Sequence, residues 1–277
     1  ELVRAIERPA AQAGVRVEPE LVAALVADVN EQPGALPLLQ YTLSELFEER
    51  ADGRLTLDAY RRLGGISGAL TQRAEAVYTG LDETGQTAAR ALFSRLVTLG
   101  EGVEDTRRRV LREELVGLGI KRLETGDSEI DGWSIAQSPN PPISSLQSPV
   151  SSVLDSFGRA RLLAFNRDPL TRGPTVEIAH EALLRAWPRL RGWLDEDRAA
   201  LRLSRLLTAA AAEWEAAGRA DGFLLRGARL DQLAPLSGGT VALTEGERRF
   251  LDAGLEAREA RRAAEEARRA AELATAQ

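Results

Sequence analysis

The only histidine of the chain, His180, follows the apolar run Thr175-Val-Glu-Ile-Ala179 and precedes a run with helical spacing. The start of a helix has free N–H groups that can bind an anion. Because an imidazole titrates near neutral pH, it can hydrogen-bond a phosphate there. The alternative is a structural role, in which the ring lies in the core or caps the helix. His180, with Glu181 beside it, is therefore a candidate phosphate contact, and a core position is the competing interpretation.

A second candidate is Pro37, in the run Gly34-Ala-Leu-Pro-Leu-Leu39. A proline in the first turn of a buried helix is common, and spacing alone favours this structural interpretation. The functional alternative is a contact with a nucleotide base.

The arginine run Arg107–Arg109, followed by Arg112, could form a solvated face or bind DNA or another phosphate-bearing partner. A DNA-reading domain needs basic residues on its recognition helix. The helix predicted over residues 150–160 carries one arginine and one aspartate, and the net charge of the chain is −6. The charge distribution therefore disfavours DNA binding.

Composition excludes several kinds of chemistry. The chain has no cysteine, which excludes disulfides, thiolate nucleophiles and cysteine zinc sites. One histidine excludes multi-histidine metal sites and disfavours Ser-His-Asp catalysis. The carboxylate pairs, such as Glu113 with Glu114 and Asp195 with Asp197, have no converging partner in the sequence, so we interpret them as surface residues. We predict no catalytic residue and no metal site.

The ends of the chain also carry information. No apolar stretch approaches the roughly 18 residues that a membrane span needs. The chain starts at Glu1 and contains no methionine, so we expect it to be a piece of a longer protein. We expect that protein to be cytoplasmic.

The hydrophobic spacing predicts a mainly α-helical chain that begins with a small bundle. Helices are predicted over residues 2–13, 19–29, 36–49 and 56–63, the last of them capped by Thr56. The third helix is expected to bury one stripe, made of Leu36, Leu39, Leu43, Leu46 and Phe47. The glycines of residues 64–68 predict a hinge-like loop.

The middle of the chain has the element order of a winged helix-turn-helix domain. We predict helices over 69–78 and 84–99, a short strand over 107–111, helices over 112–118 and 150–158, and a β-hairpin of strands 161–165 and 175–179. Residues at about 124–150 are rich in serine and proline and predict a mobile insert.

Helices resume at His180, and Pro188 predicts a break there. A separate helix is expected over 199–217, and the capping box Thr244-Glu-Gly-Glu247 opens a long last helix. We therefore predict a mainly α chain with four parts: a helical lid-type bundle (1–65), a winged helix-turn-helix domain with a small β-hairpin (66–195), a helical extension (196–243) and a long connecting helix (244–277).

Several stretches together resemble the bacterial novel STAND class of P-loop NTPases. The run Leu36-Pro37-Leu38 resembles the Gly-x-Pro motif of the STAND class. The run from Val176 to Leu184 resembles its Met-His-Asp motif, with Ala179 and Glu181 in place of Met and Asp. Further similar runs are Ile6 to Ala10, Tyr60 to Leu70 and His180 to Leu194. The resemblance covers about residues 1–235.

The resemblance implies the regulatory portion of a signalling NTPase that is switched by ATP and ADP, with Mg bound in the parent protein. The P-loop domain would precede Glu1, and β-propeller repeats of the WD type would follow. His180 would contact the β-phosphate of ADP, and Pro37 would pack near the base and sugar. This portion itself would not be catalytic, and activation would permit a homo-oligomer to form.

Two other functions remain open from the sequence. One is a winged-helix DNA-binding transcriptional regulator, and the other is a structural helical adaptor. No Gly-x-x-x-x-Gly-Lys-Ser/Thr occurs in the chain, so we expect these residues alone to bind nucleotide weakly.

Overall fold

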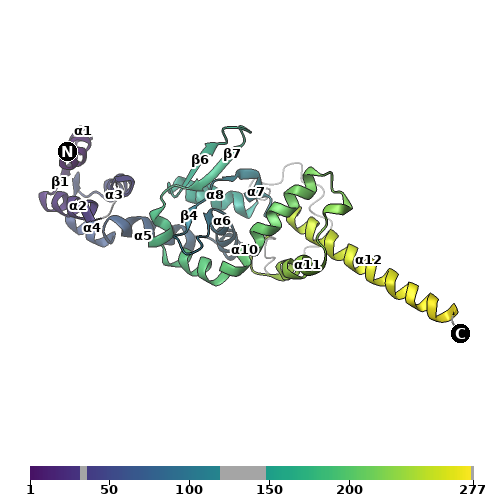
Figure 1. Ribbon diagram of the computed structural model, residues 1–277. Helices are drawn as coiled ribbons and strands as arrows, with labels where there is room; N and C mark the ends of the chain where they lie inside the picture. The colour runs from purple at the N-terminus through teal and green to yellow at the C-terminus, as the bar shows by residue number, and fades with distance from the viewer. Residues whose placement is uncertain (32–35, 119–147, 276–277) are drawn as a thin grey trace, which may run out of the picture.

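The computed structural model describes residues 1–31, 36–118 and 148–275 of the 277-residue chain. It is mainly helical with a few short strands, as predicted. The molecule is elongated, with the N-terminal helices at one end and the last helix at the other (Figure 1). The Ser/Pro-rich insert predicted at about 124–150 lies, as far as residue 147, outside the described residues.

In its described residues, the N-terminal bundle contains four helices and one pair of short parallel strands. Their bounds are α1 (Leu2–Gln12), β1 (Arg16–Val17), α2 (Pro19–Glu31), α3 (Leu36–Glu48), β2 (Arg54–Leu55) and α4 (Leu57–Arg62). The predicted cap is confirmed, because the Thr56 side chain accepts a hydrogen bond of 3.2 Å from the backbone N–H of Ala59.

The buried stripe of α3 was predicted only in part. Leu39 and Leu46 are buried, but the Leu36 side chain is 61% exposed. The helix instead turns Tyr41 and Thr42 inward. Thr42 Oγ1 donates a 3.1 Å hydrogen bond to the carbonyl oxygen of residue 66, so a neighbouring helix determines which side of α3 is covered.

The predicted hinge-like loop at residues 64–68 is wrong for most of its length. The helix α5 (Gly65–Thr79) begins at Gly65. Gly64 and Gly65 have φ angles of 76° and 77°, which glycine adopts without strain. The next side chain, Ile66, is 1% exposed, so its burial fixes the start of the helix. α5 packs against α3 and the helix α9 (Ala182–Ala186), and so joins the bundle to the rest of the molecule.

The described residues of the central part combine helices with two small sheets. Its elements are α6 (Glu83–Arg95), β3 (Val97–Thr98), β4 (Thr106–Arg107), β5 (Val110–Leu111), α7 (Arg112–Val116), α8 (Pro149–Arg159), β6 (Leu163–Arg167) and β7 (Pro174–Ile178). β3 pairs with β4, and an antiparallel sheet has the order β5-β7-β6. The β run predicted over 107–111 is therefore two strands that belong to different sheets, and the helix predicted over 84–99 ends at Arg95.

The predicted break at Pro188 is confirmed, because α9 ends at Ala186 and α10 (Pro188–Ala216) begins at the proline. The separate helix predicted over 199–217 is wrong, since α10 runs without interruption through that region. Trp187, at the break, is fully buried and packs edge-on against Phe93 and Trp193. This aromatic cluster anchors the start of α10 to α6.

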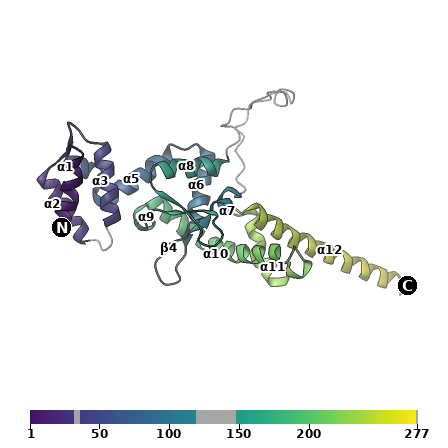
Figure 2. The same ribbon diagram turned by 90° about the horizontal axis from the view of Figure 1, so that it is seen from above.

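The C-terminal part has its own hydrophobic core. Its elements are the second half of α10, the short helices η2 (Asp221–Phe223), α11 (Gly227–Leu233) and η3 (Ala234–Gly238), and α12 (Glu245–Thr275). The predicted capping box is confirmed, because Thr244 and Glu247 exchange backbone-to-side-chain hydrogen bonds of 2.8 and 3.2 Å. From residue 258 onward α12 is exposed, and Figure 2 shows it leading away from the other helices.

Candidate functional site

His180 lies between the end of β7 and the start of α9. Its ring packs edge-on against Tyr41 of α3, with the ring centroids 5.2 Å apart. The His180 side chain is half-buried, and its Nδ1 atom is buried without a hydrogen-bond partner in the part of the chain that the structure describes. A buried polar atom without a partner costs free energy, so this nitrogen is suited to a group that is not part of these residues.

The surroundings of His180 favour the neutral form of its ring. Burial lowers the pKa of the imidazole, and the positive charge of Arg107 lowers it further. The Arg107 guanidinium is held close by, since Nη1 donates to the carbonyl oxygens of Ile178 at 3.4 Å and Ala179 at 3.3 Å. A phosphate at this place would meet one fixed cation and one imidazole.

Tyr41 joins the two residues that the sequence singles out. Its hydroxyl donates a 3.3 Å hydrogen bond to the carbonyl oxygen of Ala160, and its ring contacts His180. Pro37 lies four residues before Tyr41 on α3, and residues at this spacing share one face of a helix. Pro37 is exposed. His180 thus lies against the same helix as Pro37, about one turn away from it.

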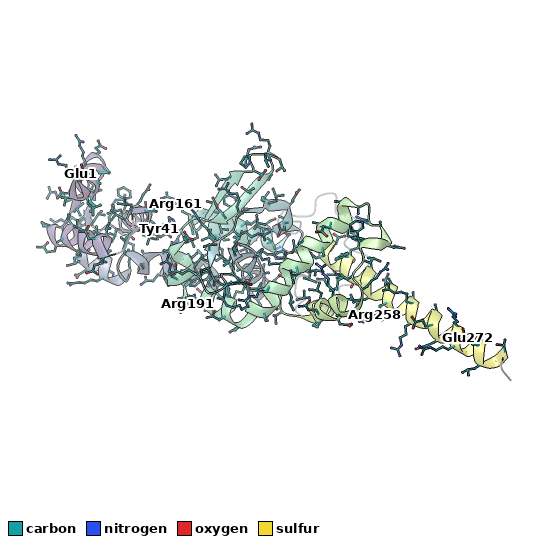
Figure 3. All side chains as sticks on the ribbon, in the orientation of Figure 1. Glu1, Tyr41, Arg161, Arg191, Arg258 and Glu272 are labelled. Carbon is teal, nitrogen blue, oxygen red and sulfur yellow. The ribbon has the colours of Figure 1, made fainter. Side chains whose placement is uncertain are left out.

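Two cations near Tyr41 were not found from the sequence. Arg73 of α5 and Arg161, just before β6, both act on the Tyr41 hydroxyl by charge. Burial and the nearby Glu45 carboxylate outweigh them and raise the Tyr41 pKa. Figure 3 shows Tyr41 and Arg161 close to one another where the N-terminal helices meet the central part. No local pattern marks these arginines, because each reaches Tyr41 from a different element.

An apolar cavity of about 680 Å³ lies between α1 and α3. Leu36, Leu39 and Leu43 of α3 contribute to one wall, and Arg161 contributes a cation to the rim. Pro37 is not in the lining, although its neighbour Leu36 is. The cavity has the size and apolar character of a small-molecule site.

The remaining sequence candidates are dispersed. Within the run of three arginines, Arg109 pairs with Glu177 at 3.1 Å, while Arg108 approaches Glu114 at 3.5 Å. Neighbouring arginines of the run therefore pair with carboxylates on different elements, and the run does not form a single solvated face. The surface assignment of Asp197 is wrong: this residue is 8% exposed and accepts hydrogen bonds from Arg90 and Thr240.

The described residues contain no group of three or more metal-binding side chains that could hold an ion. Among the helices in the described ranges, none combines the length and apolar character needed to cross a membrane.

Comparison with known proteins indicates the family of this chain. Neither the curated proteins nor the solved structures include a match to this chain. A family model described as Novel STAND NTPase 1 matches residues 1–222. The match covers both Pro37 and His180. It confirms the resemblance predicted for about residues 1–235 as far as residue 222. The chain belongs to the Novel STAND NTPase 1 family.

Proposed function

We propose that this chain is the regulatory portion of an ATP/ADP-switched signalling NTPase, and that His180 senses the phosphate of bound ADP. In this proposal α5, α6, α8 and the β6–β7 hairpin act as a winged helix-turn-helix domain, and α1 to α4 act as the lid. The P-loop domain of the same protein holds the nucleotide and its Mg ion.

One observation carries the proposal: the His180 Nδ1 atom is buried without a partner among the described residues, while its ring packs on the helix that bears Pro37. Arg107 supports it, because its positive charge beside the imidazole favours an anion. The family match supports the general class of the protein.

The proposed mechanism is a shift between two arrangements of the same domains. ADP stabilises the closed arrangement because it contacts His180 only there, and exchange for ATP releases the winged-helix domain. One charge-assisted hydrogen bond contributes about 1.5–3 kcal/mol, which changes such an equilibrium about tenfold or more. Release would then permit self-association, with downstream β-propeller repeats as the sensor.

The test is the rate of ADP release from the parent protein that includes the P-loop domain. A fluorescent ADP analogue is displaced by excess ADP from the wild type and from the His180→Ala variant. We expect release to be about tenfold faster in the variant, since one charge-assisted hydrogen bond is lost.

A matched control is Arg185→Ala, which removes an exposed side chain from the neighbouring helix α9. Its release rate should equal that of the wild type. An unchanged rate in His180→Ala would refute the proposed contact.

A further inference from the structure

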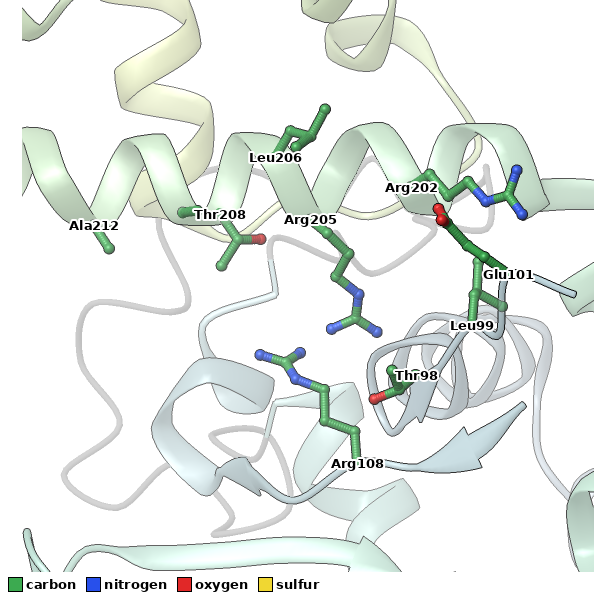
Figure 4. A pocket seen from close by; sticks show the side chains of 10 residues that line it. Thr98, Leu99, Glu101, Arg108, Arg202, Arg205, Leu206, Thr208 and Ala212 are labelled. Carbon is green, nitrogen blue, oxygen red and sulfur yellow. The ribbon is translucent and has the colours of Figure 1, made fainter. Parts of the chain in front are cut away.

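A second cavity, of about 650 Å³, lies between α10 and the segment that contains β3 and β4. Three arginines line it: Arg108 from the β4–β5 connection, and Arg202 and Arg205 from α10. Figure 4 shows Arg108 and Arg205 pointing toward one another from opposite sides of the pocket. Two facing cations repel, so an anion between them would stabilise this arrangement.

Among the described residues, the hydrogen-bond partners of Arg205 are backbone carbonyl groups. Its Nη2 atom donates to the carbonyl oxygens of Ser94 at 3.3 Å, Arg95 at 3.3 Å and Val97 at 2.5 Å. Its Nη1 atom is buried and has no partner among the residues that the structure describes. The guanidinium is therefore fixed in orientation, and the two N–H groups of Nη1 remain for a further group.

The charges around the pocket are incompletely balanced. Within the described ranges, no carboxylate lies within ion-pair distance of Arg202 or Arg205, whereas Arg108 shares Glu114 with Arg95. Burial lowers the pKa of Arg205 to about 10, and the charges of Arg108 and Arg95 contribute. The carboxylates of Glu114 and Glu247 act in the opposite direction and offset only part of this shift.

We propose that this pocket binds a small molecule through a phosphate group held between Arg108 and Arg205. A phosphate presents several oxygens to two planar guanidinium groups, which is the geometry that arginine recognises best. The pocket is separate from the His180 site and uses other residues, so the inference does not depend on the proposed nucleotide contact.

The rest of the lining fits the other part of such a molecule. Leu99, Leu206 and Ala212 form apolar surface beside the arginines, and the Leu206 side chain is 47% exposed. Arg108 and Arg205 converge in a cavity, while Arg202 points away from them at its edge. A small ligand is therefore favoured over a nucleic acid, which needs a broad basic surface.

Glu101 also lines the pocket and opposes an anion. Since it adds one negative charge at the rim, removing that charge should strengthen phosphate binding. Removing a positive charge and removing this negative charge should therefore change the phosphate affinity in opposite directions.

The experiment titrates the 277-residue chain with pyrophosphate at low ionic strength, by isothermal titration calorimetry. We expect saturable binding to the wild type. Arg202 forms no hydrogen bond or ion pair with the residues that the structure describes, and Arg202→Gln should bind more weakly by a few-fold. Arg108→Gln should bind more weakly by about tenfold or more. Glu101→Gln should bind more tightly. Thermal unfolding of each variant establishes that it is folded.

The matched control is Arg191→Gln, which removes an exposed arginine from the same helix outside the pocket. Its affinity should equal the wild-type value. The proposal would be overturned by the absence of binding to the folded wild type, or by equal weakening in Arg191→Gln and Arg108→Gln. Displacement of pyrophosphate by an equal phosphate concentration of duplex DNA would also overturn it, because it would indicate an open basic surface.

Discussion

Arg95 and Glu247 form a two-bonded ion pair inside the protein, between the end of α6 and the first turn of α12. Arg95 Nη1 donates to Glu247 Oε1 at 2.7 Å, and a second bond joins Nη2 to Oε2. The side chains are 2% and 3% exposed. The same carboxylate closes the capping box with Thr244 and accepts a hydrogen bond from Thr208. One carboxylate therefore attaches the last helix to both α6 and α10.

The first prediction concerns this ion pair. Glu247→Ala leaves the buried Arg95 with only the more distant Glu114 carboxylate, at 3.6 Å, as counter-ion. Breaking a buried ion pair in this way costs about 3–5 kcal/mol in a typical protein. We expect a corresponding loss in the free energy of unfolding, measured by urea denaturation. Glu245→Ala is the control: its carboxylate is 81% exposed and pairs with Arg249 on the surface, so less than about 1 kcal/mol should be lost. Equal losses in the two variants would contradict a special role for Glu247.

The second prediction concerns pH. Burial, with help from Arg107, lowers the pKa of His180 in the folded chain below its ordinary value. The unfolded chain therefore takes up a proton first as the pH falls through about 6.5. Since the unfolded state then binds more protons, stability decreases as the pH falls from there toward the folded-state pKa.

His180→Gln removes this titration. Unfolding midpoints in urea, measured for both chains between about pH 7.5 and 5.5, should decrease less for the variant. If the two pH profiles ran parallel, the environment of His180 would not depress its pKa.

The third prediction compares two glycines. Gly65 has a φ of 77°, and a Cβ there would lie 3.3 Å from Oδ2 of Asp28. Gly65→Ala should cost about 1–2 kcal/mol, because alanine is strained in the left-handed region. Gly192 lies within α10 with open space around it, so Gly192→Ala should add about 0.5–1 kcal/mol. Thermal unfolding of both variants should show a loss of stability for Gly65→Ala and a gain for Gly192→Ala. A change in the same direction in both variants would contradict strain at the start of α5.

The fourth prediction concerns DNA. The net charge of −6 and the burial of Val150, Val153, Leu154 and Phe157 on α8 leave little basic surface for reading a groove. We expect no mobility shift of random duplex DNA, even at low salt where non-specific binding is strongest. A shift that disappears with added salt would instead favour the DNA-binding alternative.

Features that depend on a few neighbouring residues were predictable from the sequence. Thr56 caps α4, Pro188 separates two helices, and Thr244 with Glu247 opens α12. Each acts within about one helical turn, so the local sequence contains all the partners. The same holds for the β6–β7 hairpin, whose strands shift by a residue or two from the predicted bounds.

The sequence by itself determined the helical class, the helix caps and the residue types that could meet a phosphate. Only the tertiary structure decided that His180 meets Tyr41, that Asp197 is buried, and that Arg205 faces Arg108. The reason is that the partners lie far apart in the sequence. Tyr41 and Arg205 donate hydrogen bonds to backbone carbonyl groups that are 119 and 111 residues away, and Arg95 binds a carboxylate that is 152 residues away. Hydrophobic spacing shows which face of a helix is covered, but which charged groups meet there depends on how the helices pack.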